Sequence, residues 1–328
     1  MGYQLWMSPE TGYRRQGTRF ESLHGIFLEN AKLITLFEPV LCCKDTDSAS
    51  DAKYALESRD FDITCVVDSD DAIIGQIERS TLNQGSVSDY VKEISHKEKI
   101  DENTSLVHLL EILETFNFKY VTRNGKVVGI VTRADLNKPI PRTYLFGVVS
   151  LVELHINFWI NNYYSNDSWM DALNTERQVK VQEILELRKG SSDYLAMVEC
   201  AQLCDKKEIL RNTPEFLAKF SFSKTSLKYF MEKLEVVRNE IAHSQSSIIE
   251  TLSWEVIMRT ISKSEEFLKY SDEMIEAEGK EKTKYIDNYS DLFSLLDQYL
   301  KNKRESIIIS AGAGEISNQI RFFYDSKK

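Results

Sequence analysis

The chain has 328 residues, a formal net charge of −10, and a composition with 42% hydrophobic and 28% charged residues. This length is sufficient for two domains with separate cores, and the composition is that of an ordinary globular protein. The negative charge excludes a globally basic nucleic-acid coat protein, so any RNA would have to bind a local basic patch.

The first thirty residues contain no apolar segment of the kind found in signal peptides. Arg14 and Arg15 lie close to Gly17, which permits a tight turn. Two interpretations of the arginine pair stay open, contact with a phosphate or an ordinary solvated turn. We treat residues 1–30 as an N-terminal extension.

The five cysteines, at positions 42, 43, 65, 200 and 204, contain no C-x-x-C pair. Cys200 and Cys204 are one helical turn apart, and no pair of histidines accompanies them. These features favour core thiols over a metal site and fit a reducing compartment. We therefore expect a cytoplasmic protein without a bound metal.

Residues 31–142 contain an internal repeat with an offset of 54 residues. The repeat is visible in four β-rich runs, at residues 63–68, 72–77, 119–122 and 127–132. Gly75 in the first copy corresponds to Gly129 in the second (129 − 75 = 54). A two-stranded unit cannot bury its own apolar face, so the two copies are expected to pack together.

Each copy is expected to form a β-α-β-β-α unit. With the same offset, Ser50 and Thr104 are the expected N-caps of the two internal helices. Asn124-Gly125 is a strong two-residue hairpin signal between β-rich runs. Residues 78–82 are expected to open the helix that ends the first copy.

The segment Val128-Gly129-Ile130-Val131-Thr132-Arg133-Ala134-Asp135-Leu136 is very similar to the end-of-repeat signature of CBS domains. The repeat as a whole resembles a tandem CBS pair (a Bateman module), with a closely matching second copy and a degenerate first copy. The resemblance implies a sensor that holds an adenine nucleotide in the cleft between the repeats. The alternative is a pair with a purely structural or dimerising role.

The resemblance also implies the residues that hold the nucleotide. The expected set is Thr104, Phe118, Tyr120, Val121, Thr132, Arg133 and Asp135. Asp135 would accept hydrogen bonds from the ribose, Thr132 would support the ribose or the phosphates, and the base would lie near the second strand. A helix N-terminus, which favours phosphate oxygens, fits this arrangement. Thr81 occupies the position of Asp135 in the first copy, so we expect at most one competent site per chain.

Pro139 and Pro141 disfavour helix continuation and predict a linker at residues 137–141. Helical periodicity follows, with helices expected at residues 143–163, 169–189, 192–211, 223–243, 250–277 and 289–303. The expected fold is thus an α+β pair of repeats at residues 31–142 and an all-α bundle at residues 143–304. A tail or short β-hairpin is expected at residues 305–328.

The most apolar run of the chain lies within the helix expected at residues 143–163 and includes Glu153 and His155. It is too short for a membrane span and predicts a buried helix.

The hexapeptide Arg238-Asn239-Glu240-Ile241-Ala242-His243 closes the fourth of these helices. Arg238 offers a permanent cation that fits phosphate, and His243 exchanges a proton near neutral pH. Asn239 precedes His243 by four residues, so the two share a helix face. Arg238 is about 140° from His243 around an α-helix, so its side chain must reach around the helix or serve the site of a partner chain.

Within an all-helical domain, this hexapeptide resembles the R-x4-H motif of HEPN domains. The resemblance implies a metal-independent endoribonuclease that acts as a homodimer and needs no cofactor for catalysis. RNA would be cut by its own 2′-hydroxyl, with His243 as acid–base group, Arg238 as phosphate clamp and Asn239 as orienting donor. The alternative is a helix C-terminus at which cationic residues stabilise the helix dipole.

The HEPN resemblance implies a further polar residue from an earlier helix, and Asp205 is the first choice, with Glu208 the second. Nearby basic residues could supply a local RNA-binding face, and they are Lys206, Lys207, Arg211, Lys224 and Lys228. An ordinary solvated face is the alternative for this set.

Two functions follow from these resemblances. The first is a nucleotide-regulated HEPN ribonuclease with RNA as substrate and an adenine nucleotide as effector, a combination that suits a toxin or an anti-phage defence protein. It would be a homodimer or a higher homo-oligomer, with no membrane partner. The second is a non-catalytic module that senses a nucleotide and mediates dimerisation or recruitment of a partner.

Overall fold

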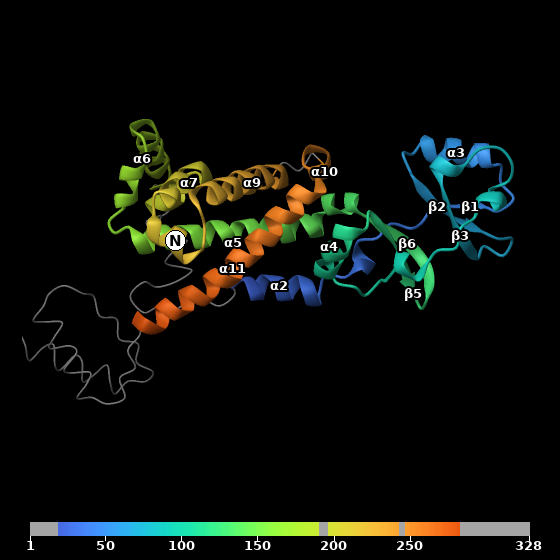
Figure 1. Ribbon diagram of the computed structural model, residues 1–328, viewed down its shortest axis with the longest axis horizontal. Helices are drawn as coiled ribbons and strands as arrows, with labels where there is room; N and C mark the ends of the chain where they lie inside the picture. The colour runs from blue at the N-terminus through green and yellow to red at the C-terminus, as the bar shows by residue number, and fades with distance from the viewer. Residues whose placement is uncertain (1–18, 190–195, 243–246, 283–328) are drawn as a thin grey trace, which may run out of the picture.

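The computed structural model describes residues 19–189, 196–242 and 247–282. Their elements form an elongated molecule, with one small sheet at one end, a second sheet in the middle and a set of helices at the other end (Figure 1). The expected C-terminal hairpin, the helix expected at residues 289–303 and the pair Arg14-Arg15 lie outside the described residues. The coarse division into an α+β unit and a helical remainder is confirmed.

Two three-stranded sheets repeat one topology. The first copy consists of β1 (Cys42–Lys44), α3 (Ala49–Glu57), β2 (Ile63–Val67) and β3 (Ile73–Glu78). The second consists of β4 (Lys99–Asp101), α4 (Leu106–Thr115), β5 (Phe118–Arg123) and β6 (Lys126–Thr132). In each copy the first two strands pair in parallel, and the last two form an antiparallel hairpin. Asn124 and Gly125 have φ angles of 51° and 78°, so the hairpin turn expected there is confirmed.

Two local expectations for the repeats were wrong. The helices α3 and α4 are capped by Ser48 and Ser105, whose hydroxyls accept from backbone N–H groups at 3.4 and 3.3 Å, and not by Ser50 and Thr104. The first copy ends in a single 3₁₀ turn, η2 (Arg79–Thr81), because the chain becomes extended directly after it.

The cap positions were missed because the offset between the copies is not constant. It is 54 for the hairpin glycines, but β1 and β4 begin 57 residues apart (99 − 42), as do α3 and α4 (106 − 49). Five residues (58–62) separate α3 from β2, but only two (116 and 117) separate α4 from β5. Because the loop after α4 is shorter, an ungapped alignment on the hairpin glycines misplaces the strand and the helix that precede it.

The segment that leads into each repeat crosses the hairpin of the other repeat. Glu38 exchanges backbone hydrogen bonds with Ile130 at 3.0 and 2.8 Å, and Lys92 does the same with Gln76 at 2.9 and 2.8 Å. A Cβ on Gly129 would lie 2.5 Å from the carbonyl oxygen of Glu38. The glycine common to both copies is therefore the position that lets the crossing backbone approach the sheet.

Gly129→Ala is expected to lower the free energy of unfolding by about 1–3 kcal/mol, because the added methyl overlaps the Glu38 carbonyl and the ring of Phe37. Gly25→Ala is the matched control, since a Cβ there meets nothing within 4 Å. Gly25 lies in helix α2 (Phe20–Glu29), so its replacement should stabilise by about 0.5–1 kcal/mol. Urea denaturation measures both, and an unchanged midpoint for Gly129→Ala would contradict the steric account.

The helical remainder is built on α5 (Pro139–Tyr163), which packs against α11 (Trp254–Lys282), α9 (Lys224–Ala242) and α2. In Figure 1, α5 runs through the middle of the helical end, with α9 on one side and α2 on the other. The remaining elements of this end are η6 (Ser168–Ala172), α6 (Thr175–Lys189), η7 (Met197–Cys200), α7 (Leu203–Arg211), α8 (Pro214–Lys219) and α10 (Ile248–Thr251). One contiguous hydrophobic core joins these helices to α4 and β6 of the second repeat.

No linker separates the second repeat from the helices. The 3₁₀ turn η5 (Arg133–Asn137) is followed directly by α5, whose first residue is Pro139. Proline is tolerated in the first turn of a helix, where the backbone N–H has no intrahelical partner, so the two prolines begin the helix and do not mark a boundary. The same effect makes Pro214 the first residue of α8.

The start and the buried face of α9 follow from its sequence. Ser223 precedes α9 and its hydroxyl accepts from the Ser226 N–H at 3.0 Å. An apolar stripe with helical spacing is buried along α9, and it includes Leu227, Phe230, Leu234 and Val237. Among the described residues, α5 alone is long and apolar enough to cross a membrane, but 67% of its most apolar window is buried against other elements. A core helix passes the same test of length and composition.

A buried polar network ties the long helices together. The hydroxyl of Ser271 on α11 lies 2.7 Å from His155 Nδ1 and accepts from the Trp159 indole N–H at 2.7 Å. His155 Nε2 is 3.5 Å from Asp272, which also accepts from the Phe20 N–H at 2.8 Å. Ser271 and His155 are fully buried, so this Ser-His-Asp set joins α2, α5 and α11 and offers no access to a substrate.

Candidate functional site

Thr132 and Asp135 form a capping box at the start of η5. One oxygen of the Asp135 carboxylate accepts from the Thr132 backbone N–H at 2.6 Å, and the Thr132 hydroxyl accepts from the Ala134 N–H at 3.1 Å. Asp135 is 8% exposed. A buried carboxylate at a helical N-terminus is stabilised by these N–H groups and keeps further lone pairs for other donors.

Lys138 supplies the counter-charge to Asp135. Its ammonium lies 2.8 Å from Asp135 Oδ1 and 2.6 Å from Glu38 Oε1, and it also donates to the carbonyl of Leu36. Partial burial alone would lower the pKa of Lys138, but the two carboxylates outweigh it and the pKa is raised. Lys138 therefore stays charged and links η5 to the segment that crosses the second sheet.

A cavity of about 10 Å³ lies beside Asp135 and Thr132. Its other walls are apolar. They come from the segment before β1, from α4 and η5, and from the first turns of α5 and α11, at Leu36, Leu106, Leu109, Leu110, Leu113, Leu136, Pro141 and Trp254. Trp254 is buried and its indole N–H has no hydrogen-bond partner. A space of this size holds about one water molecule. The site thus combines a carboxylate, a hydroxyl and an unused donor inside an apolar enclosure.

The other residues expected at the nucleotide are not brought to this cavity. Tyr120 is 0% exposed and lies between the two sheets, whereas Val121 is buried in the core that joins the second repeat to the helices. Consecutive strand residues point to opposite faces, so these two cannot line one cleft. Phe118 is half-buried and packs against Tyr120, with the ring planes at 77°.

Thr104 and Arg133 are also engaged elsewhere. The carbonyl of Thr104 accepts from the Leu33 N–H at 3.0 Å, and Ser105 takes the capping role. The Arg133 guanidinium donates to the carbonyl of Leu113 at 2.9 Å and to that of Glu114 at 3.1 Å. Arg133 therefore satisfies the C-terminal carbonyls of α4 and does not line the cavity.

The seam between the two sheets is closed. Cys65 from the first sheet and Tyr120 from the second pack with Ile94 in one small buried cluster. Burial raises the pKa of Tyr120 and raises that of Cys65 to about 12. Gln76 donates across the seam to Glu98 at 2.8 Å. These groups hold the two repeats together, which is why the base-binding role expected for Tyr120 is not available in this arrangement.

The C-terminal part of α9 presents Arg238 and Asn239 on its surface. Arg238 Nε lies 3.4 Å from Glu153 Oε1 on α5, and its guanidinium donates to Asn239 Oδ1 at 3.2 Å. His243 follows α9 in the sequence and lies outside the described residues. Glu153 is the acidic neighbour of Arg238 that sequence reasoning missed. The only available signal was a carboxylate within the most apolar run of the chain.

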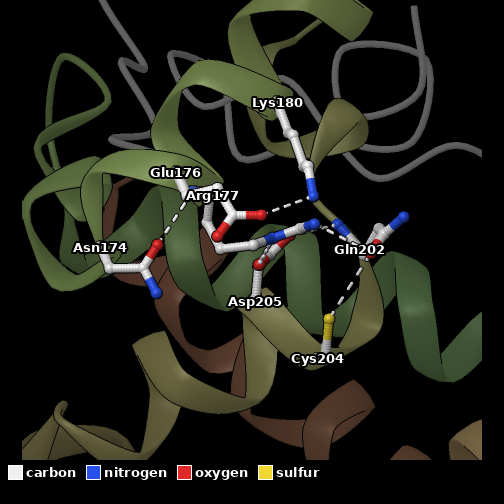
Figure 2. Close-up of polar contacts among 7 residues, drawn as sticks. All are labelled: Asn174, Glu176, Arg177, Lys180, Gln202, Cys204 and Asp205. Atoms are coloured by element: carbon white, nitrogen blue, oxygen red, sulfur yellow. Dashed lines mark hydrogen bonds and ion pairs between the residues drawn. The ribbon is translucent and has the colours of Figure 1, made fainter.

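Asp205 has a structural environment. It is 3% exposed and accepts two hydrogen bonds from Arg177, both at 2.7 Å, and one from the Gln202 backbone N–H at 2.9 Å. Figure 2 shows Asp205 enclosed by Arg177 and Gln202, with Lys180 turned toward Glu176. The Asp205 carboxylate is thus already used in capping α7 and in pairing with Arg177, and its role beside Arg238 and Asn239 stays a prediction.

The five basic residues do not form a common RNA-binding face. Lys206 is 3% exposed, and desolvation lowers its pKa despite Glu153 and Glu199 nearby. Lys207 pairs with Glu232 at 3.2 Å, and Arg211 with Glu208 at 2.9 Å, so the second choice for a catalytic carboxylate is also paired. The exposed members of the set are Lys224 and Lys228. The three basic residues of α7 are thus buried or paired with glutamates, and they do not share one solvated side of the helix.

No metal site was found in the described part of the chain. No group of three or more His, Cys, Asp and Glu side chains there has the geometry to hold an ion. All five cysteines are free thiols, and Cys200 is buried as expected for a core position. Burial raises the pKa of both Cys200 and Cys204, which keeps them protonated.

Comparison with known proteins identifies one part of the chain. The family model described as CBS domain matches residues 90–141. No curated protein matches the chain. An uncharacterized conserved protein from Pyrococcus horikoshii is 20% identical, with a TM-score of 0.29, over 33% of this chain and 90% of that chain.

Two further solved structures resemble part of the chain. CbpB in complex with c-di-AMP is 20% identical over 38% of this chain and 91% of that chain, with a TM-score of 0.31. CBSX2 in complex with AMP is 17% identical over 35% of this chain and 98% of that chain, with a TM-score of 0.29. The family match spans β4 to η5, with Thr132 and Asp135 inside it. Residues 90–141 are therefore a CBS domain.

Proposed function

We propose that the two-repeat unit senses an adenine nucleotide through Thr132 and Asp135. The observation that carries this proposal is the buried Asp135 carboxylate, which lines an apolar cavity at the N-terminus of η5 inside the CBS domain. Ligand sites commonly combine apolar walls with a few convergent polar groups. Asp135 would accept hydrogen bonds from ribose hydroxyls.

The first repeat offers no equivalent site. Thr81 occupies the position of Asp135 there, and its hydroxyl donates to the carbonyl of Glu78 at 2.8 Å. Glu78, at the position of Thr132, pairs with Lys92 at 3.0 Å. A carboxylate in place of Thr132 would repel phosphate, so the proposal is one nucleotide per chain.

Asp135→Ala is expected to weaken binding of AMP or ATP by about ten- to a hundredfold, because hydrogen bonds to a charged group contribute about 1.5–3 kcal/mol each. Titration calorimetry measures the affinity, and circular dichroism shows whether the variant is folded. Asp101→Ala is the control, since Asp101 is an exposed residue of the same domain whose carboxylate serves its own loop. A folded Asp135→Ala variant that binds as tightly as the wild type would exclude the ribose role.

We further propose that the helical half is a metal-independent endoribonuclease of the HEPN kind, acting as a homodimer. Its supports are the R-x4-H sequence at Arg238 to His243, the exposed position of Arg238 and Asn239 at the end of α9, and the all-helical surroundings. Arg238 would hold the phosphate, Asn239 would orient it, and His243 would move the proton. The adenine nucleotide would set the activity, as in a toxin or a defence protein.

One observation favours a second candidate, a non-catalytic nucleotide-sensing module. Arg238 is already engaged by Glu153 and by Asn239, as a structural residue would be. Cleavage of single-stranded RNA in EDTA, with and without AMP or ATP, separates the two. Cleavage that needs no metal supports the enzyme, and its absence under all of these conditions supports the second candidate.

A further inference from the structure

Asn137, at the end of η5, makes two hydrogen bonds to the segment that follows α9. Its side-chain amide donates to the Ser247 hydroxyl at 3.0 Å, and its Oδ1 accepts from the Ile248 backbone N–H at 2.8 Å. Ile248 is the first residue of α10 and is fully buried. Asn137 thus provides, from the CBS domain, the N-terminal cap that Ser247 does not supply with its own side chain.

Arg142 makes a similar contact to the end of α9, on the N-terminal side of His243. It lies in the first turn of α5, and its guanidinium donates to the carbonyl of Glu240 near the end of α9 at 3.0 Å. Glu240 and Ser247 stand on either side of His243 in the sequence. Asn137 and Arg142, two and seven residues after Asp135, therefore contact the chain on the two sides of His243.

The helical half also closes the cavity at Asp135. Trp254, the first residue of α11, lines it, and the Arg133 guanidinium lies 5.0 Å from the centre of the Trp254 ring. Pockets for ligands of nucleotide size have volumes of roughly 300–1,000 Å³, far above the cavity in this arrangement. A nucleotide at Asp135 must therefore displace part of this wall. Trp254 belongs to α11 in the helical half, and η5 is hydrogen-bonded to the helical half through Asn137.

We propose that Asn137 is the positioning residue that transmits occupancy of the Asp135 cavity to the start of α10, in the chain that follows His243. Binding displaces η5 and Trp254, and the two hydrogen bonds of Asn137 carry the shift to the start of α10. A ligand shifts an equilibrium only if its contacts differ between the two states, and opening this cavity supplies such a difference. The link to catalysis rests on the proposed ribonuclease, but the mechanical coupling does not.

The test compares wild type with Asn137→Ala by calorimetry with AMP and ATP, by RNA cleavage with and without each nucleotide, and by hydrogen exchange of residues 240–248. Asn137→Ala is expected to bind the nucleotides within about threefold of wild type. It should lose the nucleotide-dependent change in cleavage, so that the ratio of rates falls to about one, and lose the nucleotide-dependent change in exchange. Asn137→Asp keeps the acceptor for the Ile248 N–H and should retain part of both responses.

Asn103→Ala is the matched control, because Asn103 lies in the same domain and its amide bonds only to the neighbouring Asp101. It should respond to nucleotide as the wild type does. If nothing cuts RNA but nucleotide alters exchange at residues 240–248 in wild type and not in Asn137→Ala, the ribonuclease fails and the coupling stands. Equal responses in wild type and Asn137→Ala, or no effect of either nucleotide on exchange in wild type, overturn the inference.

Discussion

His243→Ala is expected to lower the rate of RNA cleavage by about 10²- to 10⁴-fold, the usual contribution of a general acid–base group. In the proposed mechanism a proton leaves the attacking 2′-hydroxyl and another is given to the leaving oxygen, and imidazole can do both near neutral pH. Arg238 would hold the phosphate, and its loss should have a comparable effect through charge stabilisation. Cleavage of a labelled single-stranded RNA in EDTA measures the rates.

His108→Ala is the matched control for His243→Ala, because His108 is an exposed histidine on α4 in the CBS domain. Its removal should leave cleavage unchanged. Comparable cleavage by wild type and His243→Ala would remove His243 from the chemistry and leave Arg238 with the structural role that its pairing with Glu153 suggests.

The repeat could be predicted from sequence because its key positions obey local rules. Asn124-Gly125 must form a tight turn, and Gly75 and Gly129 stand where another segment crosses the hairpin. The caps at Ser48 and Ser105 could not be predicted from a fixed offset, because the loop between helix and second strand is three residues shorter in the second copy. Serine and threonine are both preferred cap residues, so residue type alone did not separate neighbouring candidates.

The candidate sites were harder to predict because they depend on contacts between distant segments. Asp135 and Thr132 were found from a local signature, and both line the cavity. Trp254, which closes that cavity, lies more than a hundred residues away, and no sequence pattern connects the two. Asp205 was expected in the catalytic site and Lys206 on an RNA-binding or solvated face, yet both side chains are buried. Helical periodicity does not show which charged residues a neighbouring helix will cover.

Asp205→Ala is expected to lower the free energy of unfolding by about 3 kcal/mol, at the lower end of the 3–5 kcal/mol measured when one partner of a buried ion pair is removed. The lower end applies because the Arg177 side chain is 21% exposed, so water can partly solvate the unpaired guanidinium. The variant also loses the acceptor that caps the Gln202 N–H at the start of α7, an effect of about 1 kcal/mol that is included in this figure. Urea denaturation followed by circular dichroism measures the change.

Two comparisons decide whether Asp205 is structural or catalytic. Glu208→Ala, on the same helix, removes a half-exposed pair with Arg211 and should change stability by less than about 1 kcal/mol. Arg177→Met combined with Asp205→Ala should be less destabilising than the sum of the single variants, because no unpaired charge is left behind. If Asp205→Ala instead unfolds at the wild-type urea concentration and loses RNA cleavage, the carboxylate acts on the substrate and the pair with Arg177 opens during the reaction. If Asp205→Ala instead unfolds at a lower urea concentration than the wild type, any loss of cleavage follows from the displaced α7. This helix packs directly against α9, which carries Arg238.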